Sequence, residues 1–390
     1  MQRWLIGADL AARDAALARL RALFEGAGYA PIEPRHLIDA DLLLDLYGED
    51  IRSRAFLFPE PVSAGELCLR PDFTLPVAMA HGAGGWERRA AYSYAGPVFR
   101  IQDETARPIE YLQVGIERYG EADAAAADAG VLALVLEGLD ALGVGPRRVS
   151  TGDPGIFFAL LSALEMPESR RAALRRHFWR PARFRELIAG YAGARPPHGD
   201  QRAALLAAAE RGRAAVDELM GDGLRIVGAR GAEEVAERAL RLREAEAEPP
   251  MPDEQAALVE GALSVAGPSG TALSRLRALT AEAAVDITPA LERFERRLDA
   301  LNRVGIDAED LPFDARFGRL MEYYDGFVFE VAPEDGGGPP LAGGGRYDRM
   351  TERLGAPRPI PAIGAMIRPE AARAHRAPLG AELPRFGEAQ

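Results

Sequence analysis

The chain has 390 residues, of which 48% are apolar and 27% charged, so it is long enough to form two or three structural units. Its 47 basic residues are all arginine and are outnumbered by 59 acidic residues. The resulting net charge of −12 disfavours sequence-independent binding to nucleic acid or anionic membranes. The only cysteine, Cys68, cannot form an internal disulfide, and we expect it to be a buried thiol in a strand. The sequence shows no apolar leader and no apolar segment long enough to span a membrane, so we expect a cytoplasmic protein with no membrane partner.

The first 150 residues predict helices and short strands. Residues 8–27 repeat Leu and Ala against charged residues at three- to four-residue spacing, which is typical of an amphipathic helix, and helical periodicity returns at 121–142. Short β-type runs bounded by Gly and Pro lie at 55–58, 66–70, 92–101, 110–119 and 147–152. Because most links between these runs are short, we expect an α+β fold with an antiparallel sheet rather than regular alternation of strands and helices.

The second half predicts a helical insertion followed by a return of the sheet. Residues 166–300 are dominated by Ala, Leu, Arg and Glu and contain few β-branched clusters, which favours helices. β-type sequence resumes at 313–317, 323–331 and 340–344, with the glycine- and proline-rich residues 336–340 as a hairpin loop. The predicted organisation is a core in two parts, 1–165 and 301–375, separated by the insertion at 166–300 and followed by a tail at 376–390.

The most informative segment is the predicted strand from Tyr111 to Glu117. Alternation places Gln113, Gly115 and Glu117 on one face and three apolar residues on the other. A glycine between an amide and a carboxylate would leave space for a ligand to lie against the sheet. An ordinary solvent-facing sheet surface would carry the same pattern, so both interpretations stay open.

Two other segments carry polar groups that suit the charged ends of a small ligand. Arg100 and Gln102 share one face of a predicted strand, where a guanidinium would bind a carboxylate or phosphate, although a strand arginine is usually half of an ion pair. Asp72 and Thr74 follow Pro71, an arrangement suited to an ammonium group, but a helix N-cap would use the same residue types.

Tyrosines, histidines and glycines complete the inventory of candidate groups. Tyr323 and Tyr324 are adjacent in a predicted strand, so only one of the two phenols is expected to enter a given pocket. The five histidines lack the paired spacing of a zinc site, and the glycine-rich residues 343–346 lack the Lys-Ser/Thr of a phosphate-binding loop. The sequence therefore predicts no metal, no cofactor and no catalytic cluster.

Taken in chain order, these segments resemble the catalytic core of class II aminoacyl-tRNA synthetases, and specifically histidyl-tRNA synthetase. Residues 69–74 are similar to the family's LRPE-x-T element, 96–100 to the GPxFR of motif 2, and 113–117 to the QxGxE strand. Residues 322–330 and 342–348 resemble the two histidine-specific signatures, DYYTGxVFE and AGGRYD. The resemblance covers about 65–120 and 310–370, and it implies an antiparallel sheet core flanked by helices.

The same resemblance implies a histidine-binding site. Its α-amino group would be held by Asp72, Thr74 and Gln113, and its imidazole would meet Glu117 and either Tyr323 or Tyr324. Arg319 occupies the place of the family's arginine that contacts the histidine carboxylate, and Arg100 completes the predicted set. A carboxylate and a phenol at opposite ends of the imidazole would distinguish it from apolar side chains of similar shape.

The sequence departs from the synthetase pattern where ATP and tRNA would bind. After the Pro361–Gly364 match the family has a glycine and a Glu-Arg pair, whereas this chain has Arg368, Pro369 and Ala371, and a proline that lacks a backbone donor counts against the ATP-binding helix. The motif 2 loop at 102–108 keeps an arginine but loses the family's ERP, and a methionine, residue 79, replaces a usual arginine. Only 19 residues follow Ala371, too few for an anticodon-binding domain.

The chain thus matches the synthetase motifs for the amino acid but lacks those for ATP and tRNA. This pattern resembles the regulatory subunits of ATP phosphoribosyltransferase, which are paralogues of the synthetase. This resemblance implies a non-catalytic subunit with a dimeric core, which activates the short-form catalytic subunit in the first step of histidine biosynthesis and mediates feedback by histidine, without a tRNA partner. The alternatives are a histidyl-tRNA synthetase or atypical histidine-activating enzyme, and a synthetase-like domain with an unrelated role.

Overall fold

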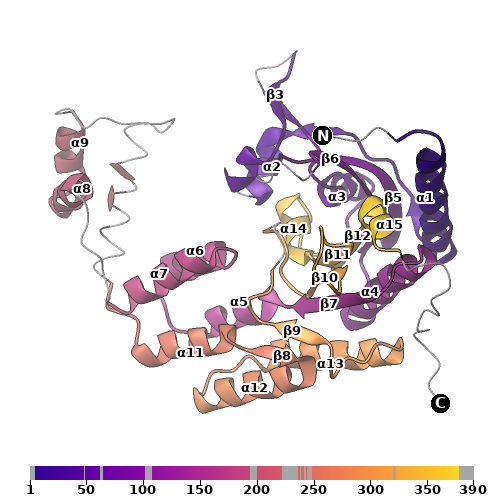
Figure 1. Cartoon of the computed structure of the whole chain (residues 1–390). Coiled ribbons are helices and arrows are strands. Elements are labelled where there is room, and N and C mark those ends of the chain that lie inside the picture. Colours follow the sequence, from indigo (N-terminus) through magenta and orange to yellow (C-terminus); the bar gives the residue numbers. More distant parts are fainter. Residues whose placement is uncertain are drawn as a thin grey trace. The chain divides into compact units, whose positions relative to one another are not determined.

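The computed structural model describes residues 5–47, 49–61, 65–101, 108–193, 200–221, 236–237, 239–240, 243, 248–318 and 322–376. Backbone contacts divide the chain into two units (Figure 1): a larger one, Met1–Leu160 with Ala262–Gln390, and a smaller one, Leu161–Gly261. The insertion expected at 166–300 is therefore divided, because 262–300 belong with the larger unit. There the short strand β8 (Ala266–Pro268) pairs with β9 (Pro312–Asp314), a tertiary contact that the local composition does not reveal.

In the described chain, nine strands form one sheet in the order β1-β5-β6-β12-β11-β10-β7-β9-β8. Besides β8 and β9 they span Ala30–Pro31 (β1), Ala90–Phe99 (β5), Glu110–Tyr119 (β6), Arg147–Gly152 (β7), Val328–Pro333 (β10), Ala342–Arg346 (β11) and Ala362–Ile367 (β12). Neighbours are antiparallel except for the β1–β5 and β7–β9 pairs. The α+β class is confirmed, and residues 336–340 lie between the paired strands β10 and β11 as expected.

Helices α1 (Ala8–Gly26) and α4 (Ala124–Ala141) pack against one face of this sheet. A Cβ on Gly138 of α4 would lie 2.7 Å from the side chain of Ile367, so helix and strand are in close contact. Val131, Leu132, Val135 and Leu139 of α4 are fully buried, and each contributes about 1.5–3 kcal/mol of hydrophobic stabilisation. Because side chains alternate along a strand, Gly364 and Met366 of β12 lie on the opposite face.

A small sheet, ordered β2-β4-β3, leads the chain onto that opposite face. Its strands are Leu37–Asp39 (β2), Leu57–Pro59 (β3) and Glu66–Leu69 (β4). Cys68 is the buried strand thiol that was predicted, and burial raises its pKa to about 12. The buried side chain of Arg70 donates to the carbonyls of Pro97 at 3.0 Å and Pro34 at 2.8 Å. These bonds attach the end of β4 to β5 and so place Asp72 and α3 (Thr74–Ala83) over the large sheet.

The remaining helices are distributed between the two units. The smaller unit holds α6 (Glu168–His177), α7 (Pro181–Tyr191), α8 (Asp200–Glu210), α9 (Arg213–Gly221) and most of α11 (Asp253–Leu263), and α5 (Pro154–Ala163) runs across the division. The larger unit holds α2 (Ala40–Tyr47), α12 (Ser269–Glu282), α13 (Thr288–Arg303), α14 (Asp348–Arg353) and α15 (Pro369–Ala374). In the described part of the chain, no helix is both long and apolar enough to cross a bilayer.

Two local predictions are wrong. The strand expected at 323–331 begins only at Val328, and Tyr323 to Phe327 precede it in a turn and an irregular segment. Pro369 was expected to count against a helix, yet α15 begins at this proline. Proline is tolerated in the first helical turn because its missing N–H would have no intrahelical partner there.

Candidate functional site

A cavity of about 190 Å³ opens on the sheet face opposite α4. A single water needs roughly 10–15 Å³, so the cavity suits a small molecule. Six of the eight residues predicted to bind histidine line it: Asp72, Thr74, Arg100, Gln113, Tyr323 and Tyr324. The other described lining residues are Tyr94, Glu330, Pro340, Gly343, Gly364, Ala365, Met366 and Arg368. Arg319, the seventh predicted residue, lies outside the described residues, and Glu117, the eighth, is not in the lining.

One row of residues, paired across five strands, contributes four of its members to the cavity lining: Tyr94, Glu330, Gly343 and Met366. Glu330, Gly343, Met366, Gly115 and Tyr94 are successive partners from β10 to β5. Gly115 was expected to leave space for a ligand, but a Cβ there would lie 2.4 Å from the hydroxyl of Tyr94. The space at Gly115 is therefore taken by the phenol of Tyr94, which itself lines the cavity.

Asp72 forms one wall and is surrounded by hydrogen-bond donors. The hydroxyl of Tyr47 donates to Oδ2 at 2.9 Å, and the hydroxyl of Tyr323 donates to the same oxygen at 3.4 Å. Oδ1 accepts from the backbone N–H of Leu75 at 3.5 Å, in the first turn of α3. The N-cap of α3 is Phe73, without a side-chain capping bond, so neither Asp72 nor Thr74 is the N-cap that the sequence offered as an alternative. Burial raises the pKa of Asp72.

Glu117 lies beneath the cavity and holds parts of its wall. Its Oε1 accepts from the hydroxyls of Thr74 at 2.9 Å and Tyr94 at 3.4 Å, and its Oε2 accepts from the hydroxyl of Tyr347. Burial raises the pKa of Glu117 to about 8, so the carboxyl is mostly protonated at neutral pH. Gly364 is its cross-strand partner, and a Cβ at that position would overlap the carboxyl group, which explains the glycine.

Tyr323 and Tyr324 both line the cavity, contrary to the expectation that only one phenol would enter it. Their hydroxyls lie 3.3 Å apart, and that of Tyr323 also contacts the hydroxyl of Thr74 at 3.2 Å. The expectation assumed a strand, in which neighbouring side chains point to opposite faces, whereas this segment is not in β10. The ring of Tyr323 is fixed by an edge contact with Tyr47 at 5.1 Å between centroids.

Arg100 and Gln113 present hydrogen-bonding groups that the described residues leave unused. Arg100 is 9% exposed; its Nε donates to the carbonyl of Pro71 at 2.7 Å, and its terminal nitrogens bond to no described residue. Gln113 is 1% exposed, and its Oε1 is buried and accepts no hydrogen bond from the described residues. Leaving a buried acceptor unsatisfied costs about 1–3 kcal/mol, so this pair of groups indicates a ligand with a donor and an acceptor.

Several lining residues were quoted in the sequence motifs but not assigned to the site. Glu330 is the only charged residue of β10, and Arg368 directly follows the fully buried strand β12, so each was visible as a charge next to apolar sequence. Tyr94 and Met366 gave no comparable signal, because aromatic and apolar residues in a strand usually belong to the core. In the described part of the chain, no three His, Cys, Asp or Glu side chains are grouped as a metal site requires.

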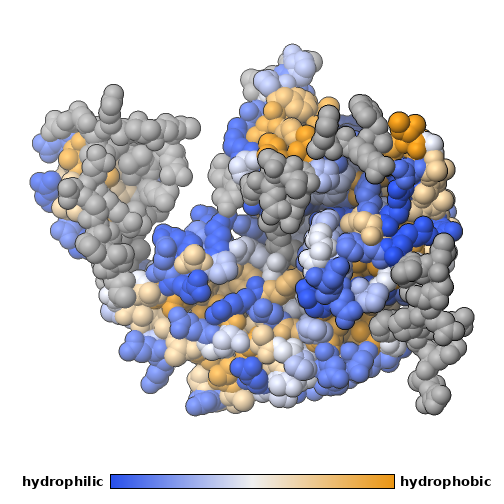
Figure 2. All heavy atoms as spheres, in the orientation of Figure 1, coloured by the Kyte–Doolittle hydropathy of each residue, from blue (hydrophilic) through white to orange (hydrophobic). Residues whose placement is uncertain are grey.

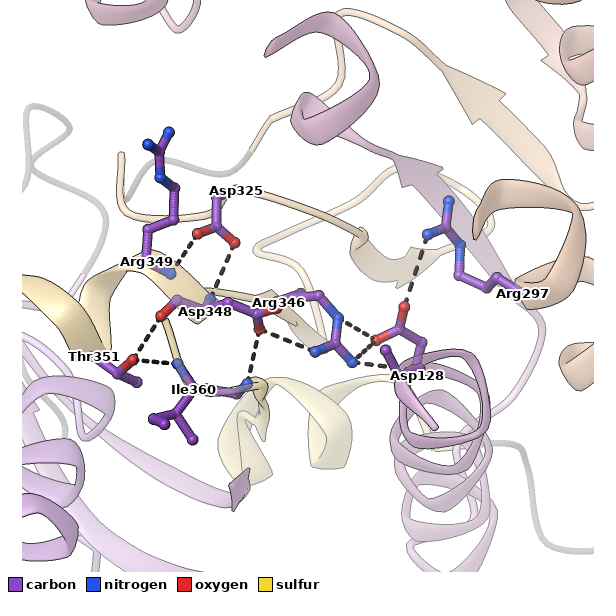
Figure 3. Close-up of polar contacts among 10 residues, drawn as sticks. Asp128, Arg297, Asp325, Arg346, Asp348, Arg349, Thr351 and Ile360 are labelled. Carbon is purple, nitrogen blue, oxygen red and sulfur yellow. Dashed lines mark hydrogen bonds and ion pairs between the residues drawn. The ribbon is translucent and has the colours of Figure 1, made fainter. Parts of the chain in front are cut away.

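A buried ion-pair network holds β11 and its neighbours beside the cavity (Figure 3). Arg346 on β11 donates to Asp128 of α4 at 2.6 and 3.0 Å and to Asp348 of α14 at 3.0 Å. Arg297 of α13 lies 3.7 Å from Asp128 and 2.8 Å from Asp153. The network thus connects three helices, α4, α13 and α14, to β11, which contributes Gly343 to the cavity lining.

The same network fixes the start of α14. Asp348 accepts from the backbone N–H of Ala362 at 2.8 Å, and Asp325 accepts from the backbone N–H groups of Asp348 at 3.1 Å and Arg349 at 2.6 Å (Figure 3). Burial, with the nearby charge of Asp348, raises the pKa of Asp325 to about 7. Tyr347 lies between the two anchored residues Arg346 and Asp348, which is why its hydroxyl reaches Glu117.

A family model for histidyl-tRNA synthetase matches residues 5–222 and 232–372 of this chain. The ATP phosphoribosyltransferase regulatory subunit of Mesorhizobium japonicum is 35% identical over 374 residues, which are 90% of this chain and 94% of that protein. The protein of the same name from Brucella canis is 36% identical over 338 residues, or 84% of this chain and 88% of the relative.

Solved structures share the fold. The crystal structure of an ATP phosphoribosyltransferase regulatory subunit/histidyl-tRNA synthetase from Bacillus halodurans aligns with a TM-score of 0.65 at 22% identity, covering 97% of this chain and 82% of the other. A histidine–tRNA ligase subunit from Alicyclobacillus acidocaldarius aligns with a TM-score of 0.59 at 26% identity, covering 96% and 95%. The expected class II synthetase-like fold is confirmed. The chain belongs to the histidyl-tRNA synthetase-like family and, within it, to the ATP phosphoribosyltransferase regulatory subunits.

Proposed function

We propose that this chain is the non-catalytic regulatory subunit of a short-form ATP phosphoribosyltransferase. It activates the catalytic subunit in the first step of histidine biosynthesis and carries the feedback signal of the end product, histidine. The name shared by relatives at 35–36% identity supports the regulatory role and the partnership with the catalytic subunit. The synthetase alternative is not favoured by these relatives.

The observation that carries the histidine part of the proposal is the unused acceptor of Gln113. An ammonium group would donate to this oxygen and to Asp72, and a carboxylate would accept from Arg100, so the lining matches both ends of an amino acid. The hydroxyls of Tyr323 and Tyr324 offer donors and acceptors to an imidazole.

One residue after the cavity strands supports a non-catalytic role. Ala371 of α15 stands where the synthetase resemblance calls for an ATP-binding arginine, and an apolar methyl group cannot bind phosphate. We therefore propose that the chain neither activates histidine with ATP nor uses tRNA as a partner.

Self-association into a dimer is part of the same proposal. Hydrophobic residues gather at the surface around β3 and α2 (Figure 2). Leu37 of the small sheet is 44% exposed, while Leu57 and Phe58 of β3 are half-buried. An apolar surface of this kind is typical of a protein interface, which supports a second copy of the chain as a partner.

Steady-state turnover of the short catalytic subunit tests the regulatory proposal. Adding this chain should raise the rate from ATP and phosphoribosyl pyrophosphate, and histidine should reverse the increase. Gln113→Ala should require about 10- to 100-fold more histidine, the range expected when one hydrogen bond to a charged group is lost. Gln255→Ala on α11 is the matched control, because that glutamine does not line the cavity.

Three outcomes separate the possibilities. A rate that does not change when the chain is added contradicts the regulatory role. Activation with an unaltered histidine response in Gln113→Ala keeps the role but moves the sensor elsewhere. Robust histidine-dependent pyrophosphate exchange by the purified chain supports the synthetase alternative instead.

A further inference from the structure

The smaller unit carries a dense run of arginine in an otherwise acidic chain. Residues 169–185 include seven arginines and no acidic residue, whereas the whole chain has a net charge of −12. The run covers most of α6, the link after it and the beginning of α7, two helices in contact with each other (Figure 1). The proposed function leaves these arginines without a role.

Three of the seven arginines are explained by the packing of the smaller unit itself. Arg170 is buried and pairs with Glu248 at 3.0 Å. Arg171 donates to the carbonyl of Leu164 at 3.1 Å, and Arg175 donates to a serine hydroxyl at the end of α5. These side chains hold α6 in place, so their charges serve the stability of the unit.

The other arginines lie around the turn that joins α6 to α7. Arg176, in the last turn of α6, is exposed, and so are Arg183 and Arg185 of α7. Arg180 is the N-cap of α7 and donates to the carbonyl of Arg176 at 3.1 Å, so the start of α7 adjoins the end of α6. We call Arg176, Trp179, Arg180 and Arg183 the basic surface.

Local stability does not explain why cations are concentrated on this surface. Arg183 lies in the first turn of α7, where the helix dipole disfavours a cation, and that turn holds no acidic residue. Its pairing with Glu186 at 2.8 Å joins side chains that are 52% and 63% exposed, so it contributes little. In the described part of the chain, Arg176 pairs with no carboxylate. The arrangement is therefore suited to a partner of negative charge.

The residue types favour a protein over a nucleic acid as this partner. Trp179 is half-buried, and its ring lies edge-on to that of Phe178 with 4.8 Å between centroids. Tryptophan and arginine are enriched among the residues that dominate protein interfaces. The net charge of −12 repels the phosphate backbone of a nucleic acid. Building on the proposed function, we propose that the basic surface binds an acidic surface of the catalytic subunit.

The test removes two of the exposed charges from the full chain. Opposite charges across an interface mainly speed association, and salt screens them. Arg176→Gln/Arg183→Gln should therefore lower the association rate constant with the short catalytic subunit about 10-fold at about 50 mM sodium chloride. The difference should largely disappear at about 500 mM, as measured by biolayer interferometry. Neither arginine is in the described lining of the cavity, so the histidine affinity should not change.

A matched variant separates the basic surface from overall charge. Arg293→Gln/Arg296→Gln removes two exposed arginines, also from one face of a helix, α13, and should leave association unchanged. Equal losses in the two double variants would assign the effect to net charge and overturn the inference.

Other outcomes distinguish this inference from the proposed function. Unchanged association of Arg176→Gln/Arg183→Gln, with activation intact, overturns the inference alone. The same holds if this variant loses binding to a duplex DNA probe but keeps the catalytic subunit, because the partner would then be a nucleic acid. Absence of any binding between the unsubstituted chain and the catalytic subunit overturns both the inference and the proposed regulatory role.

Discussion

Glu117 and Asp72 are both buried carboxyl groups, yet their surroundings give them different places in the site. Asp72 faces the cavity and lies near Arg100, whose charge opposes the effect of burial on the pKa of Asp72. Among the described residues, three hydroxyl groups rather than a cation surround the Glu117 carboxyl. Burial consequently dominates at Glu117 and raises its pKa to about 8. At the residue scale, Glu117 therefore positions Thr74 and Tyr94 as an uncharged group.

Replacing Glu117 with Gln should change how stability depends on pH. The pKa of Glu117 is raised to about 8 from the ordinary value of 4.5, so the folded chain binds this proton more tightly than the unfolded chain. The stability that this group contributes is fully present below pH 4.5 and is lost as pH rises to 8. Glu117→Gln has no proton to lose, so its free energy of unfolding should exceed that of the unsubstituted chain increasingly between pH 5 and pH 8.

Urea unfolding of both chains across this pH range measures the difference. Glu137→Gln on α4 removes an exposed carboxylate and serves as the control. Parallel pH curves for the unsubstituted chain and Glu117→Gln would mean that the Glu117 carboxyl is ionised in the folded state.

At the scale of elements, the site depends on how β11 and α14 are fixed rather than on either alone. Arg346 is 8% exposed and Asp128 is 3% exposed, so their ion pair is shielded from solvent. Arg297 contributes a second buried guanidinium to the same carboxylate. Removing Asp128 would leave two buried cations with less compensation, which is far more costly than removing an exposed partner.

Asp128→Asn should lower the free energy of unfolding by about 3 kcal/mol, because the amide keeps the shape of the side chain but not its charge. Denaturant unfolding at neutral pH measures this change. Glu295→Gln is the matched control, since Glu295 pairs with Arg277 at 2.7 Å on an exposed surface, and we expect little change there. Similar losses in both variants would contradict the importance given to the buried network.

At the scale of the whole molecule, the chain consists of two units with separate internal contacts. In the smaller unit, Arg170 of α6 is 3% exposed, donates to the carbonyl of Pro249 at 2.8 Å and pairs with Glu248 at 3.0 Å. Its guanidinium also lies 5.1 Å from the ring centroid of Tyr191, at the end of α7. This one side chain joins α6 to the end of α7 and to the residues that precede α11.

Arg170→Met should therefore loosen the smaller unit without loosening the larger one. Hydrogen exchange should accelerate at backbone amides of α6, α7 and α11, while the amides of β5 and β6 keep their protection. Exchange monitored peptide by peptide on the full chain measures this. Faster exchange in β5 and β6 as well would show that the two units open together.

The sequence by itself determined the fold class, most strand positions and six of the residues that line the cavity. Alternation on β6 correctly separated Gln113 and Glu117 from the apolar face, because a strand in a covered sheet has a strict period of two. The ordered motifs carried the family assignment, since they place several segments at once. Local patterns sufficed wherever the chain continues in one regular element.

Only the tertiary structure decided which group faces the cavity and which lies beneath it. The sequence cannot show that Tyr94 fills the space at Gly115 or that the carboxyl of Glu117 sits against Gly364. Each of these contacts joins residues from different strands, and the register between strands is set by packing of the whole sheet. Burial, and with it the pKa of Glu117, follows from that packing and not from the residue's neighbours in the chain.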